Sequence, residues 1–194
     1  EAKEKYQQLI EGYVQRHWWH PIDPSSPLPS DLAPAEIFLL GGKPGDKRKP
    51  RLVADFQPCN AQLPASSTSG IAIDDVLLVI RALSPCSLFS FDAASAFYRV
   101  RLDGDRVVLL HTGLAEGSHP DFFSDRTAFG ISSGPQAMEE SLGWLVKNFG
   151  VSAFAVVLIL LAIFVDDGIA GSSERDIVKA ALALLYVLSV CGFG

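Results

Sequence analysis

The chain has 194 residues, which is long enough to bury one sizeable core or two smaller ones. Hydrophobic residues make up 48% of the sequence, and this content excludes an intrinsically disordered chain. The net charge of −6 argues against a general nucleic-acid binder, although a protein that binds along one groove needs positive charge only there. Three cysteines at wide spacing form neither a zinc pattern nor a disulfide framework, and they predict an intracellular location, cytoplasmic or nuclear.

The N-terminal part of the sequence predicts a helix followed by an extended segment. Apolar residues recur at helical spacing in residues 1–19, which are charged and amphipathic and do not resemble a signal peptide. Trp18-Trp19 is expected to pack the end of this helix onto the body of the protein, with stacking on a nucleic-acid base as the alternative. Prolines between residues 21 and 34 then exclude a regular helix.

Strands and helices alternate in the rest of the chain. Residues 36–40 and 51–56 predict a hairpin with a basic, glycine-rich tip. Further strands are expected at 88–92, 107–111 and 122–129, and helices from Asp74 or Asp75 to about Leu83, at 134–148, and from a capping box at Ser173–Asp176 to near Gly192. This alternation predicts an α+β fold, with an antiparallel sheet and helices on one face.

The uncharged run from residue 151 to residue 165 is a candidate membrane segment. It holds fifteen residues, whereas a membrane-spanning helix needs about 20 apolar residues. Its β-branched residues favour a buried strand, and we therefore expect no membrane contact. A helical membrane fragment built from residues 151–165 and 177–191 is the alternative.

Two adjacent acids follow this run. Phe164 and Val165 lead into Asp166 and Asp167, and a short apolar segment follows, which predicts a hairpin with the acids at its tip. Neighbouring carboxylates at the end of a buried strand repel each other and resist desolvation, so they persist most easily beside a cation. Asp92 ends another apolar strand and is expected to complete a Mg²⁺ site. The alternative is that these are solvated acids at strand ends.

Four blocks of sequence resemble the reverse transcriptase domain of retroviruses and LTR-type retrotransposons. In chain order they are Arg51-Leu52-Val53-Ala54-Asp55-Phe56 with Asn60, Phe91-Asp92 with Phe97-Tyr98, Thr127-Ala128-Phe129-Gly130 with Pro135, and Phe164-Val165-Asp166-Asp167. The resemblance covers residues 16–194. It implies an RNA-directed DNA polymerase that synthesises DNA from dNTPs on a primed RNA or DNA template. A polymerase-like remnant that binds nucleic acid without catalysis is the alternative.

The resemblance also implies a division of the chain. It gives an N-terminal helix (1–20), fingers (21–86 and 103–127), a palm strand with Asp92 (87–102) and the rest of a right-hand palm (128–194). Members of the family continue with a thumb and often a ribonuclease H domain, and no thumb is present here. We therefore expect a fragment of a polyprotein that polymerises poorly or not at all by itself.

The roles of the acids follow from the same resemblance. Asp92, Asp166 and Asp167 are the implied catalytic residues, which bind two Mg²⁺ ions, with Mn²⁺ as an alternative cofactor. The backbone carbonyl of Ala93 is a further candidate ligand. Asp167 is expected to shape the site more than to bind metal.

The resemblance implies a second group of residues that bind the dNTP. Phe97 is expected beneath the sugar, where its ring favours deoxynucleotides, with a core position as the alternative. Phe129 and Gly130 are expected beneath the nascent base pair, with an ordinary turn before a helix as the alternative. Arg51 and Lys43 are expected to contact the triphosphate, although Lys47 and Lys49 compete with Lys43, and a solvated basic loop is the alternative.

Overall fold

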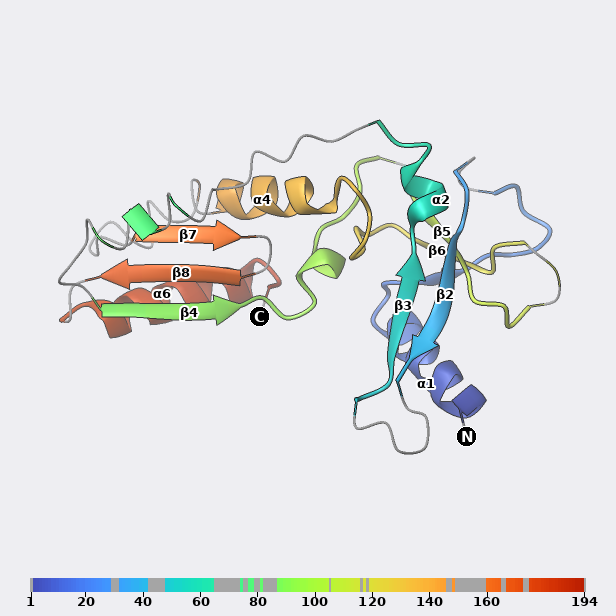
Figure 1. Ribbon diagram of the computed structural model, residues 1–194, viewed down its shortest axis with the longest axis horizontal. Helices are drawn as coiled ribbons and strands as arrows, with labels where there is room; N and C mark the ends of the chain where they lie inside the picture. Colours follow the sequence, from blue (N-terminus) through green and yellow to red (C-terminus); the bar gives the residue numbers. More distant parts are fainter. Residues whose placement is uncertain are drawn as a thin grey trace. The chain divides into compact units, whose positions relative to one another are not determined.

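The computed structural model divides into two compact units (Figure 1). Unit 1 comprises Glu1–Ala65 and Arg101–Ser132, and unit 2 comprises Ser66–Val100 and Ser133–Gly194. The structure describes residues 2–28, 32–41, 48–64, 74, 77, 78, 81, 87–104, 106–115, 117, 119–145, 148, 160–164, 167–172 and 175–193. For residues 142–143, 160–164, 167–172 and 180 it describes the backbone alone.

Unit 1 contains a five-stranded mixed sheet in the order β1-β6-β5-β2-β3. The strands are β1 (His20–Pro21), β2 (Ala35–Leu40), β3 (Arg51–Asp55), β5 (Val108–His111) and β6 (Phe122–Ser124). Strands β2 and β5 run parallel, and the other pairs are antiparallel. The pairing of Leu40 with Arg51 and of Glu36 with Asp55 confirms the predicted hairpin.

Strand β6 is shorter than the prediction of 122–129. Its partner β5 begins at Val108, which pairs with Ser124, so no strand continues beside the residues that follow. Beyond Ser124 the described ladder is reduced to one isolated bridge between Arg101 and Arg126. The expected strand therefore ends where its partner ends.

Helix α1 (Ala2–Gln15) ends before residue 19 because the chain turns back on itself. The backbone N–H of His17 donates to the carbonyl of Val14 at 2.9 Å, and that of Trp18 donates to Tyr13 at 3.0 Å. His17 has a φ of 55°, and this pair of bonds around a left-handed residue is a Schellman motif. The motif turns Trp18 and Trp19 towards the protein.

The two tryptophans are packed, as predicted. Trp18 and Trp19 are 8% and 2% exposed. The centroid of the Trp19 ring lies 4.7 Å from that of Tyr13 and 6.1 Å from that of Phe122 of β6. These aromatic contacts leave Trp19 no exposed face on which a nucleic-acid base could stack.

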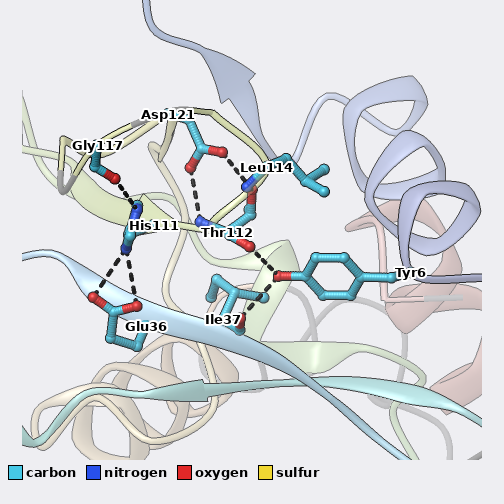
Figure 2. A network of polar contacts seen from close by, with 8 residues as sticks. All are labelled: Tyr6, Glu36, Ile37, His111, Thr112, Leu114, Gly117 and Asp121. Atoms are coloured by element: carbon cyan, nitrogen blue, oxygen red, sulfur yellow. Dashed lines mark hydrogen bonds and ion pairs between the residues drawn. The ribbon is translucent and has the colours of Figure 1, made fainter. Parts of the chain in front are cut away.

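A polar network ties α1 to the sheet of unit 1 (Figure 2). The hydroxyl of Tyr6 lies 2.8 Å from the carbonyl oxygens of Ile37 and Thr112, to which it donates its proton. The backbone N–H of Thr112 donates to Asp121 at 2.8 Å. Burial raises the pKa of Tyr6 from 10.0 to about 12, and the negative charge of Asp121 adds to the shift. No sequence pattern indicated this network, because the acceptors of Tyr6 are backbone carbonyls.

Replacing Tyr6 by phenylalanine is expected to change the alkaline stability of the chain. Tyr6 keeps its proton in the folded state at a pH where the unfolded chain loses it, so its contribution is complete below pH 10.0 and disappears as the pH rises to about 12. Tyr6→Phe should cost about 1 kcal/mol near neutral pH and should lack this alkaline fall. Urea unfolding of the wild type and Tyr6→Phe from neutral pH to about pH 12 measures the two free energies of unfolding. If both fall with pH in the same way, Tyr6 does not have this role.

Unit 2 contains a three-stranded antiparallel sheet with helices packed against it. The strands β4 (Ser87–Asp92), β8 (Asp167–Ser172) and β7 (Leu160–Phe164) lie in that order. The helices are α4 (Gly134–Leu145), α6 (Ile177–Val190) and the short 3₁₀ helix η1 (Ala96–Arg99). Figure 1 shows α6 running along the sheet. The prediction of an antiparallel sheet with packed helices is confirmed for this unit.

The core of unit 2 joins these elements. Met138 of α4 and Leu184 of α6 are 0% and 2% exposed and belong to one hydrophobic cluster. Phe89 and Phe91 of β4 pack against this cluster. Alternate residues of β4 therefore face the helices.

Two sequence predictions for unit 2 need correction. Residues 160–164 pair as strand β7, so the helical membrane alternative is wrong there, and no helix within the described ranges is long and apolar enough to span a membrane. Asp176 is itself the N-cap of α6, whereas the capping box placed it three residues inside the helix. Oδ1 of Asp176 lies 3.6 Å from Nζ of Lys179, and the side chain of Asp176 makes no capping hydrogen bond. Ser173 lies outside the described residues.

The helix predicted between Asp74 and Leu83 is described at four positions. Residues 74, 77, 78 and 81 are helical there. The others lie outside the described residues.

Candidate functional site

The acid at the end of β4 lies on the face of the strand opposite to the hydrophobic core. Phe89 and Phe91 are partly buried against the core cluster, whereas Leu88, Ser90 and Asp92 are exposed. This alternation follows from the two-residue period of a strand. Asp92 is therefore accessible to a ligand at the end of a strand whose other side is fixed by packing.

The strand register brings Asp92 and Asp167 together. Asp92 is the Cα partner of Asp167 in the antiparallel β4–β8 pair, and Asp167 is the partner of Phe164 in the β7–β8 pair. Directly opposed positions in such a pair share one face of the sheet, with Cβ atoms about 5 Å apart. Strands β7 and β8 confirm the predicted hairpin, while Val165 and Asp166, which join them, lie outside the described residues.

The donor chemistry of this strand end suits a hard divalent cation. Like charges directly opposite each other destabilise a pair of strands, so a cation bound between them would offset their electrostatic repulsion. The carbonyl of Ala93 accepts a bond from the backbone N–H of Ala96 at 3.2 Å. A carbonyl oxygen has two lone pairs and can accept a second partner as well. Among the residues with described side chains, no group of three metal-binding residues is found.

The turn after Asp92 sends Phe97 into the core. Ser95 has left-handed backbone angles, with φ 55° and ψ 36°, and begins η1. Phe97 is 6% exposed and belongs to the same cluster as Met138. Phe97 therefore occupies a core position, which was the alternative to a place beneath the sugar. Its role in sugar selection stays a prediction.

The residues expected to bind the dNTP in unit 1 lie on two segments. Arg51 is the exposed first residue of β3, and Lys49 is exposed just before it. Phe129 is 77% exposed, which is unusual for a ring of this size. Lys43 and Lys47 lie outside the described residues.

Gly130 occupies a position that other residues would strain. Its φ is +107°, and a Cβ added there would lie 3.0 Å from Cδ2 of Phe56. Phe56 is 3% exposed and has no room to retreat. The close approach of backbone to ring explains the glycine, and it needs no ligand to do so.

Asn60 is a residue to which the sequence assigned no role. Its side chain bonds to Gly130 and to Ser132, on the segment that carries Phe129. An asparagine at the end of a four-residue helix gives no signal of a contact so distant in sequence.

Two of the solved structures with a similar fold are from prototype foamy virus. The native protease–reverse transcriptase of this virus superposes with a TM-score of 0.67 at 13% identity, over 98% of this chain and 22% of that chain. Its selenomethionine-labelled CSH mutant gives 0.69 at 14% identity, over 98% and 23%. No protein-family model matches the sequence, and neither does any curated protein.

These findings define the class of fold. The chain has a mixed α+β fold that resembles part of the foamy virus protease–reverse transcriptase. At this identity the likeness shows the fold alone. The chain spans less than a quarter of the length of either structure.

Proposed function

We propose that the chain provides the fingers and palm of a retroelement reverse transcriptase of the retroviral and LTR-retrotransposon type. In this proposal residues 21–86 and 103–127 are the fingers and residues 87–102 and 128–194 are the palm. The reaction is template-directed DNA synthesis from dNTPs. The observation that carries it is the register of Asp92 opposite Asp167 on the exposed side of β4, within a reverse-transcriptase-like fold. If these acids were only solvated residues at strand ends, nothing would require them to be paired directly opposite each other.

The proposed chemistry uses oxygen ligands from neighbouring strands. Asp92, Asp166 and Asp167 supply carboxylates, and Ala93 supplies a carbonyl oxygen. When bound, a pair of Mg²⁺ ions, or of Mn²⁺ ions, activates the 3′-hydroxyl of the primer and stabilises the leaving pyrophosphate. The strand pairing fixes the spacing of Asp92 and Asp167 before any ligand arrives, so little is lost in ordering them.

The proposed contacts to the nucleotide come from other side chains. Arg51 and Lys43 pair with the triphosphate, because a guanidinium or ammonium group neutralises phosphate oxygens. Phe97 limits the space at the sugar, and Phe129 with Gly130 supports the nascent base pair. The exposure of the Phe129 ring supports its part in this assignment.

Single-turnover primer extension tests the proposal. The full chain is held in excess over a labelled primer on an RNA or DNA template, with one dNTP and Mg²⁺. We expect slow, non-processive addition of the complementary dNTP and none in EDTA, with a mismatched dNTP added about a hundredfold more slowly.

The main alternative is a polymerase-like module that binds nucleic acid without catalysis. A wild-type chain that binds the primer–template but adds no complementary nucleotide in Mg²⁺ or Mn²⁺ would favour it and would overturn DNA synthesis by this chain itself. Addition that ignores the template base would also contradict template-directed synthesis.

A further inference from the structure

One amide side chain in unit 1 joins two segments that lie 70 residues apart in the sequence. Nδ2 of Asn60 donates to the carbonyl oxygen of Gly130 at 2.8 Å. The backbone N–H of Ser132 donates to Oδ1 of Asn60 at 2.9 Å. The side chain therefore holds the backbone of residues 130 and 132 at once.

The two bonds specify an amide of this length. Gly130 offers an acceptor and Ser132 offers a donor, so the group between them must donate on one side and accept on the other. A carboxylate at position 60 would keep the bond from Ser132 and would set an oxygen against the carbonyl of Gly130. An alanine would make neither bond.

The position of Asn60 is itself fixed by its neighbours. It is the last residue of α2 (Gln57–Asn60), which follows β3 directly. The carboxylate of Asp55 accepts the backbone N–H of Gln57 at 2.9 Å, and the N–H of Asn60 donates to Phe56 at 2.7 Å. The amide is thus anchored to the end of a sheet strand.

A second contact restrains the same backbone. Gly130 lies against the buried ring of Phe56, and its φ of +107° is one that other residues rarely adopt. Phe129, one residue earlier, is 77% exposed. Asn60 and Phe56 together hold the backbone that presents an aromatic ring at the surface.

We infer that Asn60 is a positioning residue for nucleotide binding, which acts by holding residues 129–132 in the conformation that receives the dNTP. The inference rests on the proposed function, because it assigns Asn60 to the nucleotide contacts proposed for Phe129 and Gly130. Asn60 acts through the backbone of this segment. It is therefore expected to affect the dNTP affinity more than the rate of the chemical step.

The experiment compares Asn60→Ala, Asn60→Asp and the control Gln62→Ala in the full chain. Gln62 is an exposed amide two residues further on, whose Oε1 accepts the backbone N–H of Ala33 at 2.7 Å, so its loss removes a bond to a different segment. Amide hydrogen exchange at Ser132 reports the conformation of the segment. Single-turnover extension at varied dNTP gives the dNTP dissociation constant separately from the maximal rate.

We expect three results from these variants. Asn60→Ala should speed exchange at Ser132 about tenfold and weaken dNTP binding about tenfold, with the maximal rate changed less than about twofold. Asn60→Asp, which tests the idea even if the alanine variant fails to fold, should keep Ser132 protected and still weaken dNTP binding. Gln62→Ala should match the wild type in both measurements.

The outcomes separate this inference from the proposed function. Unchanged exchange at Ser132 in Asn60→Ala, or wild-type dNTP affinity in both Asn60 variants of an active chain, overturns the inference alone. A loss of affinity in Gln62→Ala equal to that in Asn60→Ala also overturns it. A wild-type chain that adds no nucleotide overturns the proposed function and this inference with it.

Discussion

Replacing Asp92 by asparagine is expected to slow Mg²⁺-dependent nucleotide addition by about a thousandfold, because the loss of one metal-binding carboxylate removes several kcal/mol of transition-state stabilisation. The substitution keeps the size of the side chain and the pairing of β4 with β8, since the register is made by the backbone. Asp92→Asn therefore removes a charge at a strand end without disturbing the core. Single-turnover primer extension measures the effect.

Asp103→Asn is the matched control for this loss of charge. Asp103 is exposed, and the described bond that it makes here uses its backbone carbonyl, which accepts from Arg106 at 3.3 Å. We expect its rate of nucleotide addition to lie within about twofold of the wild type, since surface charges away from a site have small effects. An Asp92→Asn chain as active as the Asp103→Asn chain would exclude Asp92 from catalysis.

Replacing Leu184 by alanine is expected to lower the free energy of unfolding by about 2–5 kcal/mol. Leu184 is 2% exposed and packs in the core cluster of unit 2, so its removal leaves a cavity among atoms that cannot collapse fully. Such a loss is a large fraction of the stability of an ordinary domain. Urea unfolding followed by circular dichroism measures it.

Leu182→Ala on the same helix is the control for Leu184→Ala. Leu182 is 63% exposed, so the same substitution removes little buried surface there. The helix propensities change equally in the two variants, and the difference between them isolates the packing contribution. We expect Leu182→Ala to change the stability by less than about 0.5 kcal/mol, and equal losses in the two variants would contradict the core assigned to α6.

Hydrophobic periodicity predicted most of the elements of unit 2. The spacing of apolar residues in α6 was enough to place a helix, and the β-branched content of the uncharged run that ends at Val165 was enough to place a strand. The predicted start of α6 was wrong, because the N-cap is Asp176, the last residue of the predicted capping box. Several acidic and hydroxyl residues near a helix start can each serve as the N-cap, and tertiary structure selects among them.

The meeting of Asp92 and Asp167 could not be predicted from spacing alone. The register between distant strands depends on the packing of whole elements, and a shift of one residue would move one acid to the other face. The family resemblance supplied the expectation that the acids converge. The register agrees with that expectation for Asp92 and Asp167, while Asp166 lies outside the described residues.

Hydrogen bonds from side chains to backbone groups could not be predicted from the sequence. Asn60 bonds to the backbone of Gly130 and Ser132, and Tyr6 bonds to two carbonyls. Every residue except proline carries the same backbone donor and acceptor, so no residue type marks such a partner. Phe97 shows the converse, because a buried aromatic and a nucleotide-contacting aromatic look alike in sequence.

The most direct test of the central claim is the thermal stability of wild type and Asp92→Asn with and without Mg²⁺. Without metal, we expect Asp92→Asn to be at least as stable as the wild type, because one of two opposed charges is gone. Saturating Mg²⁺ should raise the midpoint of the wild type and of Asp103→Asn by several degrees, through binding to the folded state alone, and should leave Asp92→Asn unchanged. Equal Mg²⁺ stabilisation of the wild type and Asp92→Asn would contradict a cation site between these two strands.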